Sequence, residues 1–232
     1  MTAGPQGDVL PVGPRRRSGA AGLAERIARE LEEDIAMGLL HPRERLVEDA
    51  LMDRFDVKRH VVRAALTALE GRGAVERRAN VGALVRSFSE AEVLELYAVR
   101  ELLEVACARA IELPVRAGSL EAVEVALEEH AQAVRGRDHR AALRANVRFH
   151  EALFGLAPNQ VLVDDVRRHA RMATPIRSIT VTDTALLERA EDEHRAMVHA
   201  LREGDVDALV QTCVQHLHPS RDAYLELLRA RR

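Results

Sequence analysis

Apolar residues recur at helical spacing along almost the whole of this 232-residue chain. Leu23, Ile27 and Leu31 set the pattern near the start, and similar series continue beyond residue 90. Residues three and four apart share one face of a helix, so each series predicts a helix with one buried face. Aromatic residues make up only 3% of the chain, which suits cores of Leu, Val and Ala. The chain should therefore be mainly α.

The helical pattern is interrupted at residues 74–88. Before this stretch, the sequence predicts the long first helix, a short helix near residues 48–55, and another that starts around Lys58. Within the stretch, alternating apolar residues flank a turn with Asn80 and Gly82, which predicts a strand, a tight turn and a second strand. Three helices followed by a hairpin form a winged helix-turn-helix.

A capping box at residues 89–92 opens a second part, in which only helices are expected. These six helices are predicted at residues 90–113, 119–135, 138–156, 159–180, 184–203 and 206–230. Pro175 lies inside the fourth and should bend or break it. The expected fold class is thus mainly α, an N-terminal winged helix-turn-helix plus a C-terminal antiparallel six-helix bundle.

The chain is expected to divide into three parts. Residues 1–18, with three Pro and three Gly, should be a flexible arm. Residues 19–88 should form the winged helix-turn-helix domain, and residues 89–232 the all-helical domain. Cys107 and Cys213 lie in apolar helical patterns and should be buried free thiols. With no signal core and no run of about 18 apolar residues, a cytoplasmic protein without a membrane partner is expected.

The distribution of charge points to a nucleic-acid partner, although the net charge is −3. Residues 1–88 carry 15 basic against 13 acidic side chains, and the remaining 144 residues carry 19 against 24. Within the first part, residues 57–86 hold seven basic and two acidic residues. Such a local excess is typical of a surface that faces phosphate. The alternative is a solvated helix with ordinary surface charge.

The helix that starts near Lys58 carries the side chains expected to read DNA. In a helix-turn-helix, the N-terminal residues of the second helix meet base edges in the major groove. Arg59 is expected to contact guanine with its planar fork, whereas Lys58 and Arg63 should hold phosphate and His60 is left without a role. The full set expected at DNA, with the wing included, is Lys58, Arg59, His60, Arg63, Arg77, Arg78, Asn80 and Gly82.

From residue 19 to residue 230 the chain resembles the GntR-type bacterial transcription regulators with an all-helical FCD effector domain. Family members carry a stretch like VSRTPVREAL before a short wing, and here it stands as VKRHVVRAAL at residues 57–66. Lys58 and His60 replace small hydroxyl residues that help to hold phosphate or read bases in the family. The operator sequence should therefore not be inferred from relatives. The resemblance implies a homodimeric, ligand-responsive regulator, most often a repressor, that binds an inverted repeat in double-stranded DNA. Residues 19–88 would then be its DNA-binding domain, and residues 89–232 its domain for effector binding and dimerisation.

Four residues of the second part are candidate metal ligands. Asn146 and His150 share one helix face, and His194 and His216 come from later helices. Taken singly, each histidine is more commonly a hydrogen-bonded core or surface group, but together they suit Zn, Ni or a related divalent ion. The resemblance adds that FCD domains bind a divalent metal through one Asp and three His, whose positions these four residues occupy. Because Asn146 replaces the aspartate, the metal should be held less tightly.

Arg100 matches the family's first-helix arginine, which points into the cavity and pairs with a ligand carboxylate. Its alternative partner is Glu104, four residues further on. Arginine and metal together imply a receptor for a small organic acid. The rival classes are a metal-dependent hydrolase that uses the histidines with Glu191 or Glu193, and a metal-binding protein without a DNA role. The chain carries no HExxH, GxSxG or Walker lysine motif, so an enzyme is not expected.

Overall fold

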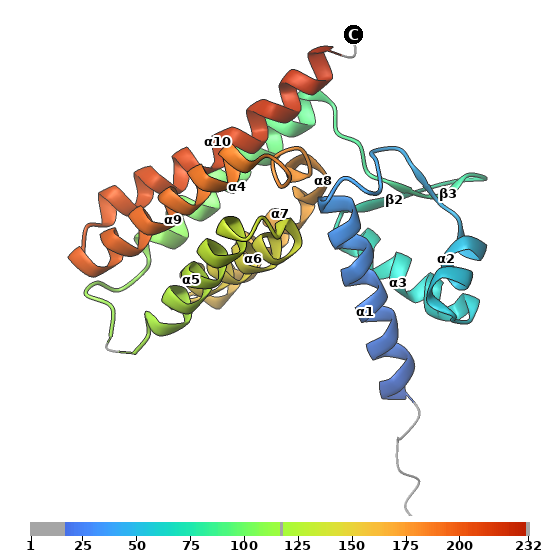
Figure 1. Cartoon of the computed structure of the whole chain (residues 1–232), viewed down its shortest axis with the longest axis horizontal. Coiled ribbons are helices and arrows are strands. Elements are labelled where there is room, and N and C mark those ends of the chain that lie inside the picture. Colours follow the sequence, from blue (N-terminus) through green and yellow to red (C-terminus); the bar gives the residue numbers. More distant parts are fainter. Residues whose placement is uncertain (1–16, 117, 231–232) are drawn as a thin grey trace, which may run out of the picture.

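In the computed structural model, which describes residues 17–116 and 118–230, a small mixed domain precedes a helical one (Figure 1). The first domain contains three helices and three short strands. Its helices are α1 (Arg17–Ala36), α2 (Glu48–Phe55) and α3 (Arg59–Gly71), and its strands are β1 (Arg45–Leu46), β2 (Val75–Arg78) and β3 (Gly82–Val85). The strands form one antiparallel sheet in the order β1-β3-β2. This is the expected winged helix-turn-helix.

The core of the first domain lies where α1 packs against α3. The apolar series of the two helices meet there, and Leu31, Val62, Leu66 and Leu69 are at most 1% exposed. Between α2 and α3 the chain turns at Asp56, which adopts a left-handed conformation with a φ of +48°. Such a residue ends a helix by turning the backbone away from its axis. The turn leaves the N-terminal residues of α3 on the surface.

The wing is the β2–β3 hairpin. Val75 pairs with Val85 and Arg78 pairs with Gly82. Asn80 and Gly82 take φ values of +62° and +99°, a region that favours Asn and Gly, so the predicted turn residues are where the turn requires them. The edge strand β1 was not predicted, because its two residues are too few to display an alternating pattern.

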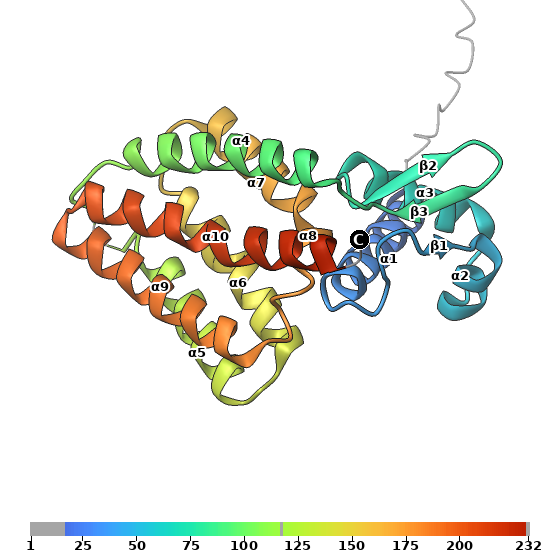
Figure 2. The ribbon, with the colours of Figure 1, turned by 90° about the horizontal axis from the view of Figure 1, so that it is seen from above.

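The second domain is a bundle in which neighbouring helices run antiparallel (Figures 1 and 2). It contains α4 (Glu90–Arg109), α5 (Glu121–Arg135), α6 (His139–Phe154), α7 (Gln160–Met172), α8 (Thr174–Arg177), α9 (Thr184–Glu203) and α10 (Val206–Ala230). Helix α10 lies along α4, and α5 packs on α6 and α9. Its main core contains Phe149, Leu153 and Met197 together with both free cysteines, which are buried as expected.

Two predicted helices differ from the structure by more than two residues. The helix expected to reach residue 113 ends at Arg109, since the residue before Pro114 is disfavoured in the α conformation and the last turn has already tightened. The helix expected at residues 159–180 is broken at Ala173 into α7 and α8, with Pro175 in the first turn of α8. Proline is tolerated at that position because its missing N–H would have no partner there.

The two domains meet along α1, which packs against α6 and α8. Arg144 of α6 donates two hydrogen bonds to Glu33 of α1, at 2.7 and 2.8 Å. Nearby, Gly73 has a φ of +75°, and a Cβ at this residue would lie 2.9 Å from Cγ of Met172. The domains therefore touch through both ion pairs and close packing.

The first 16 residues, which make up most of the expected arm, lie outside the described residues. Residues 17 and 18, which were assigned to the same arm, already belong to α1. Across the described parts of the chain, no helix combines the length and the hydropathy needed to cross a membrane.

Candidate DNA-binding surface, metal centre and ligand cavity

All eight residues expected at DNA are exposed, on α3, at its N-terminus or in the wing. Arg59 and Arg63 are paired with acids of α2. Arg59 contacts Glu48 at 3.4 Å and Asp49 at 2.5 Å, and Nε of Arg63 lies 3.0 Å from Glu48. A hydrogen bond from Arg63 lowers the pKa of Glu48, so this carboxylate is ionised at neutral pH. DNA would have to replace these acids as the partner of both arginines.

The wing arginines lie differently. Arg77 donates to the Thr67 hydroxyl at 3.0 Å and pairs with Glu70, both of α3, which holds the wing against the helix. Arg78 pairs with its neighbour Glu76 and is more than half exposed. Arg78 is thus the freer of the two to meet a phosphate.

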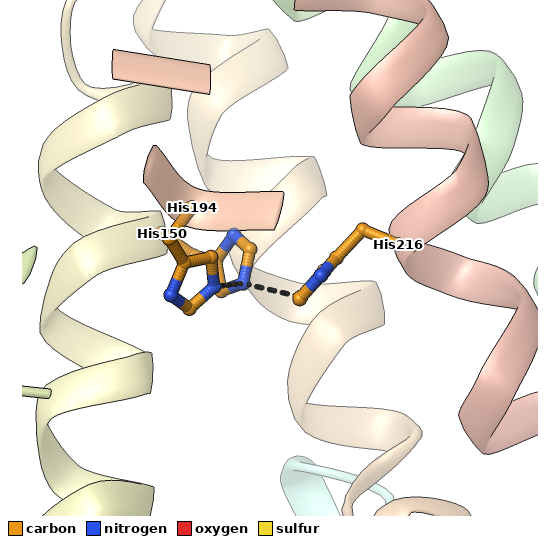
Figure 3. A group of neighbouring side chains, drawn as sticks. All are labelled: His150, His194 and His216. Carbon is orange, nitrogen blue, oxygen red and sulfur yellow. Dashed lines mark hydrogen bonds between the residues drawn. The ribbon is translucent and has the colours of Figure 1, made fainter. Parts of the chain in front are cut away.

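Three histidines converge inside the helical domain. Figure 3 shows the imidazoles of His150, His194 and His216 turned toward one another from α6, α9 and α10. Their Nε2 atoms lie 3.0 Å apart between His150 and His216, and 3.3 Å apart between His194 and His150. Two nitrogens on one tetrahedral Zn, each at about 2.05 Å, would be about 3.3 Å apart, so these two separations fit a shared ion. The candidate ligand atoms of all three histidines lie within 4.8 Å of one another.

The protonation of these histidines also suits a metal. Burial lowers the pKa of His150 and His194 well below the usual range, and repulsion from His216 lowers it further. Both are therefore neutral at pH 7, the form that binds metal. Nδ1 of His216 lies 2.7 Å from a carboxylate oxygen of Glu193. In the tautomer that donates Nδ1–H to Glu193, the lone pair of Nε2 of His216 is available to a metal.

Glu193 supplies negative charge beside the cluster. Burial opposes its ionisation, but hydrogen bonds from His216 and Arg189 outweigh burial and lower its pKa. Asn146, the fourth expected ligand, lines the same small cavity as His150 and His216. The four candidate ligands are thus uncharged groups. The nearby carboxylate of Glu193 hydrogen-bonds to the Nδ1 side of the His216 ring.

A fourth buried histidine was missed by the sequence analysis. His130 of α5 is 0% exposed, neither ring nitrogen has a hydrogen-bond partner among the described residues, and burial lowers its pKa to about 4. Its ring centroid lies 4.9 Å from that of His194. The spacing of Val123, Ala126, His130 and Val134 places His130 on the apolar face of its helix, and that signal could have identified it.

Arg100 combines the two interpretations that its sequence left open. It is buried and donates to Glu104 from Nε at 3.2 Å and from Nη2 at 2.9 Å. It also lines a cavity of about 910 Å³, whose walls come from α1 and from the helical domain, together with His150 and Arg177. The same three residues line the small cavity beside the histidines. The ion pair therefore holds Arg100 at the junction of the two spaces.

Side chains cap the N-termini of α4 and α7. Ser89 and Glu92 form the predicted capping box. Asn159 caps α7 by accepting a hydrogen bond from the backbone N–H of Leu162.

A winged helix-turn-helix joined to a helical domain with a polar internal cavity defines a DNA-binding transcription regulator. The sequence pattern of the FCD domain matches residues 95–219, and that of the gntR family of bacterial regulatory proteins matches residues 23–85. The chain therefore belongs to the GntR family, in the branch with an FCD domain. The family regulates transcription and is not enzymatic, so the hydrolase alternative is set aside.

Individual relatives agree with this membership. The HTH-type transcriptional repressor RspR of Escherichia coli strain K12 is 25% identical over 193 residues, which cover 83% of this chain and 85% of the relative. Two solved structures share the fold. A GntR-type protein from Rhodococcus sp. RHA1 is 24% identical, with a TM-score of 0.74 and coverage of 88% and 98%. McbR/YncC of E. coli is 17% identical, with a TM-score of 0.76 and coverage of 89% and 98%.

Proposed function

We propose that this regulator is a homodimeric repressor whose helical domain senses a small organic acid with the help of a divalent metal ion such as Zn or Ni. We further propose that residues 19–88 bind one half of an inverted repeat and that residues 89–232 bind effector and partner subunit. With chromosomal DNA as its partner, it would act in the cytoplasm.

The cavity between the domains is the observation that carries the sensing role. Its walls include acids of α1, from the DNA-binding domain, and Arg100 and His150 of the helical domain. Its volume of about 910 Å³ lies within the range of about 300–1,000 Å³ that is usual for small-ligand sites. A ligand there would contact both domains at once. It would therefore favour one relative arrangement of the domains over others, as a regulatory ligand must.

His150, His194 and His216 would hold the ion, with the amide oxygen of Asn146 as a fourth donor. A bound divalent ion would supply positive charge and a coordination position for an acid oxygen. Arg100, held in place by Glu104, has one guanidinium nitrogen, Nη1, without a partner among the described residues, and this nitrogen can donate to the same acid. Glu193 keeps His216 in the ligating orientation through its Nδ1.

At the DNA surface, Arg59 would contact a guanine while Lys58, Arg63 and the wing contact phosphate. Glu48 and Asp49 hold Arg59 near the N-terminus of α3, so its side chain is already placed over the end of the helix. Their carboxylates would also repel phosphate from a misplaced duplex, which favours correct docking.

A face of α4 supports the proposed dimer. Leu94, Val99 and Leu102 are large apolar residues, and 41 to 72% of each is exposed. Val99 and Leu102, three residues apart, share one face of the helix, and Leu94 lies two turns before Leu102 at its edge. We propose that this side packs against a second copy, because an inverted repeat requires two recognition helices related by two-fold symmetry.

The test is a footprint on the promoter next to the protein's own gene, repeated with a panel of carboxylic acids and with a chelator. We expect a protected inverted repeat, release by at least one acid, and loss of that release after chelation. A protein that protects no fragment at low salt would contradict the proposal. Protection that no acid changes would contradict its sensing part alone.

A further inference from the structure

Three arginines that line the interdomain cavity each have one buried guanidinium nitrogen without a hydrogen-bond partner among the described residues. These nitrogens are Nη1 of Arg100, Nε of Arg167 and Nε of Arg177, from three different helices. A buried N–H without a partner destabilises the folded state, so such groups usually mark a ligand or ordered water. Their convergence on one cavity indicates an anionic ligand.

Of the three arginines, Arg177 has the fewest polar partners among the described residues. Within the described parts of the chain its guanidinium makes no hydrogen bond and has no carboxylate within ion-pair distance, whereas Arg100 has Glu104 and Arg167 has Asp164. Burial lowers the pKa of Arg177, and repulsion from Arg100 lowers it further. The side chain belongs to α8, whose Pro175 and Ile176 are buried and fix its position.

The charge beside the histidines points the same way. Arg100 is neutralised by Glu104 and Glu193 by Arg189, so the positive charge of Arg177 remains. A divalent ion held by three neutral imidazoles and an amide would add two further charges without compensation. One carboxylate on the ligand would balance only part of this excess.

Resting on the proposed sensing role, we infer that the ligand of this cavity carries at least two anionic groups. One group would be bound beside His150 and Arg100, and another by Arg177, which lines both cavities with them, while Arg167 lines the larger cavity. The matching class is a di- or tricarboxylate or a phosphorylated acid, in preference to a monocarboxylate. Arginine suits both oxyacids because its planar fork donates two parallel hydrogen bonds.

The test compares matched acids on the full-length protein loaded with Zn, with calorimetry as the readout. Succinate is paired with butyrate and malate with 2-hydroxybutyrate, so that each pair differs by one carboxylate. Citrate and 3-phosphoglycerate are added to separate carboxylate from phosphate recognition. We expect the dianion of each pair to bind at least tenfold more tightly. Equal affinities within both pairs would overturn the inference and leave acid-induced release of DNA, and hence the proposed function, intact.

Arg177→Gln should reduce the ratio of dianion to monoanion affinity within each pair to about one, because the guanidinium of Arg177 would bind the second anionic group. Without ligand, the variant should melt no lower than the native protein, since it loses a buried charge that has no partner. A merely structural arginine would lower the melting temperature instead. Arg177→Lys keeps the charge and should retain part of the preference.

Arg202→Gln is the matched control, because it removes one positive charge from an exposed pair with Glu124 outside the cavity. It should leave the ratio unchanged. An unchanged ratio in Arg177→Gln would also overturn the inference. If no acid binds the loaded protein and DNA binding responds to none, the proposed sensing function fails together with it.

Discussion

The carboxylate of Asp34 in α1 lies 3.0 Å from Nη2 of Arg140 in α6. A buried carboxylate of the DNA-binding domain is therefore bound by an arginine of the helical domain. The same carboxylate lies 2.6 Å from Nη2 of Arg54 in α2. Helix α6 also carries Asn146 and His150, two of the proposed metal ligands. A shift of α6 on ligand binding would therefore be transmitted to the DNA-binding domain through Asp34.

Asp34→Asn should weaken this link while leaving the DNA-reading residues unchanged. We expect the free energy of unfolding to fall by about 1–3 kcal/mol, because two arginines lose a charged partner. The acid-induced loss of DNA affinity should fall at least fivefold, as measured by fluorescence anisotropy. Arg29→Gln, which removes an exposed pair with Glu25, is the control and should change stability by less than about 0.5 kcal/mol. A full response to acid in Asp34→Asn would show that coupling runs elsewhere.

Metal affinity should respond to charge near the histidines. Asn146→Asp adds a negative ligand and should tighten binding at least tenfold, whereas Glu193→Gln removes the partner of His216 and should weaken it by about 10–100-fold. Competition with a chelator measures both changes. Replacement of His150 and His194 by Ala should eliminate bound metal in elemental analysis. Unchanged metal content in that double variant would refute the ligand assignment.

Two arginines of the DNA-binding surface should differ in their effects. Arg59→Ala should cost about 1–3 kcal/mol of specific binding and relax the preference at one base pair, since it removes a base contact. Arg78→Ala should weaken binding to all sequences alike and reduce the salt dependence by about one charge. Titrations of operator and random DNA at several salt concentrations distinguish these outcomes. A uniform loss from Arg59→Ala would assign that residue to phosphate.

Low pH should weaken the contact between the two domains. A hydrogen bond from Arg144 lowers the pKa of Glu33, with Arg140 adding to the effect against the opposing influence of burial. A lowered pKa means that the folded state binds fewer protons than the unfolded chain, so this contribution is complete above about pH 5 and disappears as the pH falls through the folded pKa.

Glu33→Gln isolates that contribution. At pH 7 the variant should be about 1 kcal/mol less stable than the native protein in urea unfolding, because these pairs are partly exposed. The two curves of stability against pH should converge at acidic pH, where the native carboxyl is protonated. A difference that is constant with pH would mean that the ion pairs contribute nothing.

Local signals predicted much of the fold. Apolar spacing predicted the helices, the capping box at Ser89 began α4 as expected, and Pro175 divided α7 from α8. Each of these depends on residues within a turn or two, and such information is present in the sequence. The end of α4 was wrong by four residues, because a proline acts on the turn before it as well as on its neighbour.

Features that join distant segments were not predictable in the same way. The convergence of His150, His194 and His216 followed from the resemblance, and periodicity alone did not reveal it. His130 was missed because one histidine on an apolar face ordinarily signals nothing. A role for Arg177 follows only from its place beside Arg100 in the lining of both cavities, and that arrangement depends on how the helices pack.

Gly73 sits at positive φ where the wing domain presses on Met172. Any larger residue there would be strained, and its Cβ would press against Met172 of α7 at the contact between the two domains. A genetic selection for alleles that ignore the inducer should therefore return substitutions at this glycine as well as at the histidines.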